Sequence, residues 1–156
     1  MGRLTFNEAI KSSFVLVGYS AAGKWSGDIV HPIPELWERS YKCISEKNAD
    51  RIVGVCLPPR SDHYFYTCGM EIESVDFHKV EQGMTLHTFP TQKYVVFKHI
   101  GHSKEIPNTY ALLWDTFDNE GYKMKEGMPE IEIVHANMYG KEETNEYEME
   151  IWIPVE

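Results

Sequence analysis

The sequence has no long apolar run. No segment approaches the roughly 18 consecutive apolar residues that a membrane-spanning helix needs, and Met1–Glu8 lacks the continuous apolar stretch of a secretory signal peptide. We therefore expect a cytoplasmic protein that makes no use of a membrane. With 42% hydrophobic and 25% charged residues the composition is ordinary for a globular chain, and 156 residues suit a single domain spanning 1–156.

Cysteine is scarce. The three cysteines, Cys43, Cys56 and Cys68, are odd in number and contain no short-spaced pair, which excludes a disulfide framework and a zinc knuckle. Each lies in an apolar neighbourhood, so we expect reduced, buried thiols. His99 and His102 are close in sequence, but no third ligand stands at a recognisable spacing, so we expect no metal site.

Local signatures of catalysis are missing as well. The chain contains no Gly-x-Ser-x-Gly elbow. The segment Ala21–Lys24 has neither the leading glycine nor the following Ser or Thr of a phosphate-binding loop. We expect no cofactor, and a binding protein rather than an enzyme.

Positive charge is in short supply. The formal net charge is −9, and from Phe117 onward eleven acidic residues stand against three basic ones. A nucleic-acid binder depends on basic side chains that neutralise phosphates, so we expect no direct binding of nucleic acid. An acidic chain is a better host for positively charged ligands, although a solvated acidic surface explains the same imbalance.

What the sequence does contain is a repeat. Leu36-Trp37 returns 77 positions later as Leu113-Trp114, Ile52–Cys56 falls at that offset on Pro129–Ile133, and Met70–Ile72 recurs 79 positions on as Met149–Ile151. A period of this length is too long for a solenoid repeat. It predicts two half-domains around a pseudo-twofold axis, with a ligand cleft where the halves meet.

Apolar periodicity and turn residues predict a similar element order in both halves. The expected strands are Phe14–Ser20, Arg51–Leu57, Tyr64–Glu73, Thr91–His99, Pro129–Val134 and Tyr147–Val155, and the expected helices are Ile33–Lys47 and Thr109–Asn119. The segment Ser74–Phe89 is expected to be a short strand or a loop. The fold class that follows is α+β, with a mostly antiparallel sheet and two helices on one face.

Several short motifs, taken in order, resemble one known family. They are Val17-Gly18, Ile33–Trp37, Gly54-Val55, Tyr66 with Gly69–Glu71, Tyr94–Gly101, Glu132 and Ile151–Val155. Together they are similar to the GyrI-like small-molecule-binding domain, the effector-binding domain of AraC-type and multidrug-responsive transcription regulators. The resemblance implies a duplicated βαββ fold and a small-molecule ligand. Such domains often follow a DNA-binding domain, and since the motifs here begin near the start of the sequence, we expect a stand-alone member of the family. Gly101-His102 and Val134 depart from the Gly-Pro and the aromatic residue that the family often has there.

Glu132 is the residue that we single out. At the 77-residue offset its counterpart is Val55, and if that valine faces inward, Glu132 should do the same. A carboxylate on an inward face needs a positive partner, and in the family that the chain resembles a glutamate at this position faces bound organic cations. A solvent-facing glutamate on an amphipathic strand is the alternative.

Aromatic side chains are the expected walls of the cleft, because rings offer flat apolar area and a negative face to a cation. The candidates are Tyr66, Trp152, Trp37, Trp114, Tyr94 and Tyr147. Trp37 and Trp114 also suit a purely structural role at helical spacing. Glu71 is a weaker second acid, and Glu130 alternates with Glu132 along one strand, as either a carboxylate pair for acid–base work or surface charge.

Three functions are compatible with these patterns. The first is a binding module for an amphipathic, cationic small molecule. The second, implied by the resemblance, is a hydrolase of electrophilic small molecules with Glu132 as general base. The third is an inhibitor of a DNA-binding enzyme, in which the acidic C-terminal part mimics nucleic acid. We choose the first, and leave open a protein partner or a homodimer.

Overall fold

The computed structural model describes residues 4–27, 30–45, 50–72 and 80–156. Its strands are β1 (Phe6–Lys11), β2 (Phe14–Lys24), β3 (Arg51–Leu57), β4 (His63–Ile72), β5 (Thr85–Phe89), β6 (Gln92–Ile100), β7 (Glu130–His135) and β8 (Glu148–Pro154). Its helices are α1 (Ile33–Ser45) and α2 (Ile106–Asn119). Neither of these helices of the described chain is long and apolar enough to cross a membrane.

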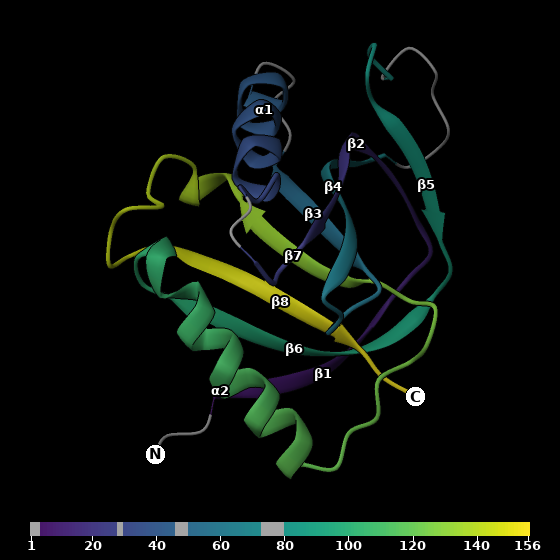
Figure 1. The fold of residues 1–156 in the computed structure, drawn as a ribbon, viewed down its shortest axis with the longest axis vertical. Helices are drawn as coiled ribbons and strands as arrows, with labels where there is room; N and C mark the ends of the chain where they lie inside the picture. Colours follow the sequence, from purple (N-terminus) through teal and green to yellow (C-terminus); the bar gives the residue numbers. More distant parts are fainter. Residues whose placement is uncertain (1–3, 28–29, 46–49, 73–79) are drawn as a thin grey trace.

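One antiparallel sheet carries both halves of the chain (Figure 1). The strand order is β1-β6-β8-β7-β3-β4-β2-β5, so β7 and β3 form the central pair. On one side of that pair β8 and β6 follow, and on the other side β4 and β2 follow in the same way. The unit β2-α1-β3-β4 is thereby repeated as β6-α2-β7-β8. The predicted α+β class is confirmed, with a duplicated βαββ arrangement.

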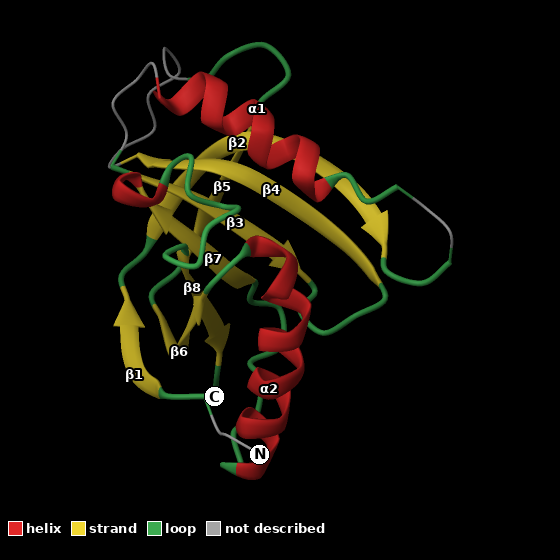
Figure 2. Cartoon of the chain, turned by 90° about the vertical axis from the view of Figure 1, so that its left-hand side faces the viewer, coloured by secondary structure: helices red, strands yellow, loops and turns green. Residues whose placement is uncertain are grey.

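Both helices lie on the same face of the sheet (Figure 2). Helix α1 begins at Ile33-Pro34, where proline suits the first turn, and it buries Leu36 in a core formed with β2, β3 and β4. Helix α2 begins in the same way at Ile106-Pro107 and buries Leu113 and Phe117 in a core formed with β6, β7 and β8. Each half therefore has its own core under its own helix.

The other face of the sheet is covered by strands from the two ends of the same sheet, which curl toward each other. A third core lies there, formed by Leu16, Val53, Val55, Tyr94, Ile131 and Ile133, with Phe14, Phe89 and Trp152 packed against it. Strand β5 is at one end of the strand order and β6 is near the other, yet only Pro90-Thr91 connects them. The sheet must therefore curl toward this face, which leaves the helix face as the place for a ligand.

Several element boundaries differ from the prediction. Strand β1 is not predicted, because apolar and polar residues do not alternate regularly along Phe6–Lys11, and the structure pairs it with β6 at the sheet edge. Helix α2 begins before the predicted Thr109, since Pro107 belongs to its first turn. The predicted ends at Lys47 and Glu73 lie outside the described residues, as does the beginning of the predicted segment 74–89.

The register of the central strand pair places Glu132 directly opposite Gly54. A side chain at residue 54 would point toward Trp37, so both positions face the helices. Val55 instead pairs with Ile131 and belongs to the core on the opposite face. The predicted correspondence of Val55 with Glu132 is therefore wrong by one residue, and the counterpart of Glu132 on the same face is Gly54.

Candidate functional site

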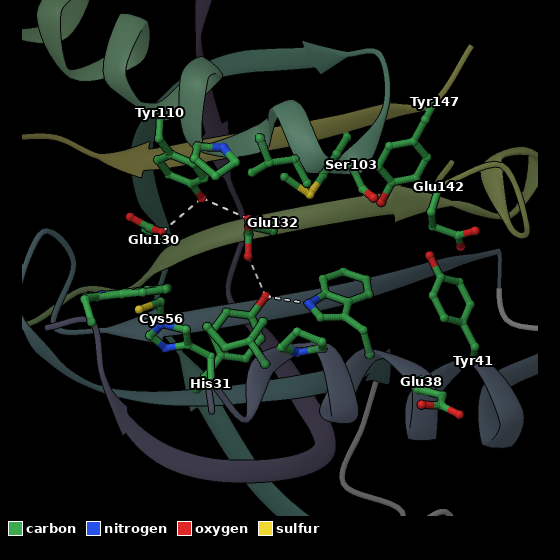
Figure 3. A pocket seen from close by; sticks show the side chains of 18 of the residues that line it. His31, Glu38, Tyr41, Cys56, Ser103, Tyr110, Glu130, Glu132, Glu142 and Tyr147 are labelled. Atoms are coloured by element: carbon green, nitrogen blue, oxygen red, sulfur yellow. Dashed lines mark hydrogen bonds between the residues drawn. The ribbon is translucent and has the colours of Figure 1, made fainter. Parts of the chain in front are cut away.

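A large cavity lies on the helix face, above the central strands (Figure 3). Its volume is about 940 Å³, near the upper end of the range for small-molecule sites. Both helices line it, together with residues of β3, β4, β7 and β8. The cavity is therefore built by both halves of the duplicated fold, where the repeat predicts a cleft.

Glu132 lies at the floor of this cavity. Its side chain projects from β7, and only 9% of the residue is exposed. Tyr66 Oη donates a hydrogen bond to Oε1 at 2.5 Å, and Tyr110 Oη donates one to Oε2 at 2.9 Å (Figure 3). Each half thus supplies one phenol to the same carboxylate. Burial raises the pKa of Glu132 above its ordinary value, and the two phenol hydrogen bonds oppose that rise.

The phenol of Tyr66 is itself held in place. Trp37 Nε1 donates to Tyr66 Oη at 2.9 Å, so hydrogen bonds link α1 through β4 to the carboxylate on β7. The ring fits there because residue 54 is glycine. A Cβ at Gly54 would lie 2.1 Å from Tyr66 Oη, closer than any real contact. The glycine opposite Glu132 in the sheet therefore makes the room that the phenol needs.

Glu130 is the second carboxylate of the floor. It is 7% exposed, and Tyr110 Oη lies 3.1 Å from its Oε1. Burial, and then the charge of Glu132, raise the pKa of Glu130 to about 8. A phenol has a single proton to donate. Since Glu132 and Glu130 both approach Tyr110, all three groups are satisfied when Glu130 holds a proton and Glu132 does not.

Aromatic rings form much of the cavity wall. Trp37 from α1 and Trp114 from α2, the repeated tryptophans of the sequence, both line it, and so does Tyr147. Further rings, which the sequence patterns do not single out as walls, are Trp25, Tyr41 and Tyr110. The guanidinium of Arg60 lies 4.7 Å from the centre of the Trp114 ring, and both of its terminal nitrogens donate to Asp118 at 2.8 and 2.7 Å.

The charge of the cavity is mainly negative. Among the described residues, four glutamates line it: Glu38, Glu130, Glu132 and Glu142. The basic side chains that line it are Arg60, which Asp118 neutralises, and His31, whose Nδ1 lies 3.3 Å from Tyr64 Oη. Over the described ranges, no lysine or arginine pairs with Glu130 or Glu132. In the same part of the chain, no cluster of three or more His, Cys, Asp or Glu side chains is arranged to hold a metal ion.

Cys56 also faces the cavity and lies opposite Glu130 in the sheet. Burial raises the pKa of its thiol well above the ordinary range, so the thiolate nucleophile is scarce at neutral pH. Cys56 and Cys68 are free and buried, as predicted. The side chain of Cys43 lies outside the described residues.

Three candidate residues lie away from the cavity. Tyr94 and Trp152 pack together in the core on the opposite face, with ring centroids 5.8 Å apart, because successive side chains of a strand alternate between faces. Glu71 lies between two residues that pack in the core under α1, so its side chain points to the opposite face of the sheet. Its carboxylate is paired with Lys11, at 2.5 Å, and with Arg51. The predicted place of Tyr94 and Trp152 in the cavity wall is therefore corrected.

Sequence patterns do not single out Tyr110, although the repeat holds a signal for it. At the 77-residue offset its counterpart on the first helix is Ile33, and both residues line the cavity. A hydroxyl therefore replaces an apolar side chain one helical turn before the repeated Trp114. Such a polar exception at one position of a repeat indicates a functional side chain.

Three comparisons with known proteins identify relatives of this chain. A family model described as an integron-associated effector-binding protein, Cass2, matches residues 10–155. The chain is 25% identical over 150 residues to the transcriptional regulator BrlR of Pseudomonas aeruginosa. That match covers 93% of this chain and 53% of BrlR, so the chain spans about half the length of that regulator.

Solved structures show the same fold. SAV2435, solved bound to tetraphenylphosphonium, matches with a TM-score of 0.76 and 19% identity over 98% of this chain and 94% of that one. An integron cassette protein from the mobile metagenome of Vibrio cholerae matches with a TM-score of 0.65 and 18% identity over 97% and 95%. These findings agree with the resemblance to GyrI-like effector-binding domains. Since the family model covers nearly the whole sequence, the chain belongs to the integron-associated effector-binding protein family.

Proposed function

We propose that this protein binds amphipathic organic cations in the cavity between its helices, with Glu132 as the partner of the positive charge. One observation carries the proposal. The Glu132 carboxylate is buried and held by two phenols, yet it has no basic partner among the described residues. An ionised carboxylate in such a place is costly unless a positive charge meets it.

The cavity wall favours an organic cation over a small hydrated one. Trp37, Trp114 and Tyr147 line the cavity around the carboxylates, and a ring face attracts a cation by about 0.5–2 kcal/mol. A lipophilic cation also loses little hydration when it enters an apolar cavity. The similar structure SAV2435 holds tetraphenylphosphonium, which supports this cation as the first probe.

Glu132→Gln is expected to weaken the binding of tetraphenylphosphonium by at least about tenfold. The amide keeps the size of the side chain and an acceptor for one of the two phenols, but it removes the negative charge. A tenfold change corresponds to about 1.4 kcal/mol, and the loss of one partner of a buried ion pair usually costs more. Isothermal titration calorimetry of the purified wild type and variant measures the effect.

The matched control is Glu126→Gln, which makes the same change in net charge at an exposed loop residue before β7. It should bind like the wild type. Tetraphenylborate, an anion of nearly the same shape, serves as the second control. It is titrated into the protein by itself, because the two ions precipitate together, and it should not bind. Equal binding of the cation by Glu132→Gln and the wild type, or equal affinity of the wild type for the anion and the cation, would refute the proposed role of Glu132.

Hydrolysis of an electrophilic small molecule is a second candidate function. The observation in its favour is the unequal carboxyl pair, because Glu130 as a neutral acid and Glu132 as a base provide the two roles of general acid–base catalysis. Incubation with an aryl epoxide, followed by chromatography, should then show a diol product that Glu132→Gln does not form. Binding of the epoxide without product would leave only the binding function.

A further inference from the structure

The cavity floor has the geometry to meet two positive charges. Glu130 and Glu132 lie two residues apart on the same face of β7, and both line the cavity. Side chains so placed on a strand are about 6.6 Å apart. The two residues are 7% and 9% exposed, so solvent screens neither carboxyl group well.

The hydrogen bonds indicate that Glu132, and not Glu130, carries the negative charge of the cavity floor. Its carboxylate accepts from Tyr66 at 2.5 Å and from Tyr110 at 2.9 Å. Within the described residues Glu130 has only the longer contact with Tyr110, at 3.1 Å. The carboxyl group with more donors is the better place for a negative charge. Glu130 therefore holds a proton at neutral pH, in agreement with the rise of its pKa to about 8 on burial.

We propose that Glu130 is the residue by which the cavity distinguishes compact dications from monocations. A monocation is held by Glu132 while Glu130 stays protonated. The second positive group of a flat dication displaces the proton of Glu130. In that step the carboxyl O–H bond breaks, its electron pair stays on the carboxylate, and the proton passes to solvent. This inference rests on the proposed function, because it assigns a ligand class to the same cavity.

Other titratable groups also line the cavity. They are the phenols of Tyr66, Tyr110, Tyr41 and Tyr147, the thiol of Cys56, Arg60, His31, Glu38, Glu142 and Glu132. Burial raises the pKa values of the four phenols and the thiol away from neutrality, and the hydrogen bonds to Asp118 raise that of Arg60. His31, Glu38 and Glu142 are present in both the wild type and Glu130→Gln, so the difference in proton release between these two proteins reports Glu130.

Two probes of matched shape test the inference. They are 1,1′-dimethyl-4,4′-bipyridinium, a flat dication, and 1-methyl-4-phenylpyridinium, the corresponding monocation. Calorimetry at pH 7 in buffers with different heats of ionisation gives the number of protons released. We expect close to one proton for each dication bound and less than about half a proton for each monocation. Dication affinity should rise by up to about tenfold per pH unit between pH 6 and pH 8, and monocation affinity much less.

Glu130→Gln should abolish the proton release that accompanies dication binding. It should also lower the ratio of dication to monocation affinity at pH 8 by at least about tenfold, because the second positive group then has no carboxylate to meet. Glu126→Gln should leave both the proton release and the ratio as in the wild type. The comparison of the two probes on the wild type stands by itself, even where a variant folds poorly.

The outcomes separate this inference from the proposed function. Equal proton release by the two probes, or undiminished release by Glu130→Gln, overturns the role of Glu130. If at the same time the monocation binds and Glu132→Gln weakens that binding, the proposed function is retained without the role of Glu130. If neither probe nor tetraphenylphosphonium binds, both are overturned.

Discussion

Replacing Gly54 with alanine is expected to lower the free energy of unfolding by several kcal/mol and to weaken cation binding. The added Cβ would lie 2.1 Å from Tyr66 Oη and 3.0 Å from Trp37 Cζ2. Tyr66 is fully buried, so its ring has little room to move away. Overpacking of this kind costs about 1–3 kcal/mol. A displaced hydroxyl also leaves the Trp37 donor and one oxygen of Glu132 unpaired, at about 1–3 kcal/mol.

Comparison with Tyr66→Phe separates the cost of overpacking from the cost of the lost hydrogen bonds. This variant removes the same hydroxyl but adds no atom, so it should lose only the hydrogen-bond part of the effect. Urea denaturation of both variants gives the free energies of unfolding, and tetraphenylphosphonium titration gives the affinities. If Gly54→Ala is no less stable than Tyr66→Phe, the glycine is not needed for the close approach of the phenol.

The helices show how much of this site the repeat predicts. At the 77-residue offset Leu36 corresponds to Leu113, and both are buried in their own cores. Trp37 corresponds to Trp114, and both line the cavity. The prediction works here because a helix presents a given face only every three to four residues, so a shared pair of neighbouring residues fixes the orientation of each copy.

The strands show where the same reasoning fails. The offset that aligns the helices pairs Val55 with Glu132, whereas Gly54 is the residue that faces the helices opposite Glu132. A slip of one residue moves a side chain to the other face of a sheet. The inward orientation of Glu132 is therefore predicted from the wrong counterpart residue. Its pairing with Gly54, and not with Val55, is what places Glu132 on the helix face.

Burial of the sheet on both faces explains why the sequence does not predict correctly which strand residues face the cavity. All residues of β7 from Glu130 to Val134 are buried, so no alternation of polar and apolar residues marks the side that faces the cavity. Tyr94 and Trp152 are as aromatic as the residues that line the cavity, but they pack in the core that the curled sheet covers. Which ring belongs to which face depends on the register and the curl, and both are tertiary properties.

Raising the pH from 5 to 9 is expected to destabilise the protein without ligand, and Glu130 is the main cause. Its pKa is about 8 in the folded state, against an ordinary value of 4.5. Between these values the folded state holds a proton that the unfolded state lacks. The contribution of Glu130 to stability is thus complete below pH 4.5 and falls by up to about 1.4 kcal/mol per pH unit as the pH approaches 8. The pKa of Glu132 is also raised and acts in the same direction.

The free energy of unfolding of Glu130→Gln should fall less steeply with rising pH than that of the wild type. This variant should also be more stable than the wild type at pH 8, because the amide has no charge to bury. Urea denaturation at several values between pH 5 and pH 9 measures both curves. Burial lowers the pKa of His87, which favours the folded state as the pH rises through this group, but it does so in both proteins, so their difference reports Glu130. Glu126→Gln should keep the wild-type slope. A wild-type slope in Glu130→Gln would mean that Glu130 ionises in the folded protein as it does in water, and the assignment of the proton to Glu130 would then fail.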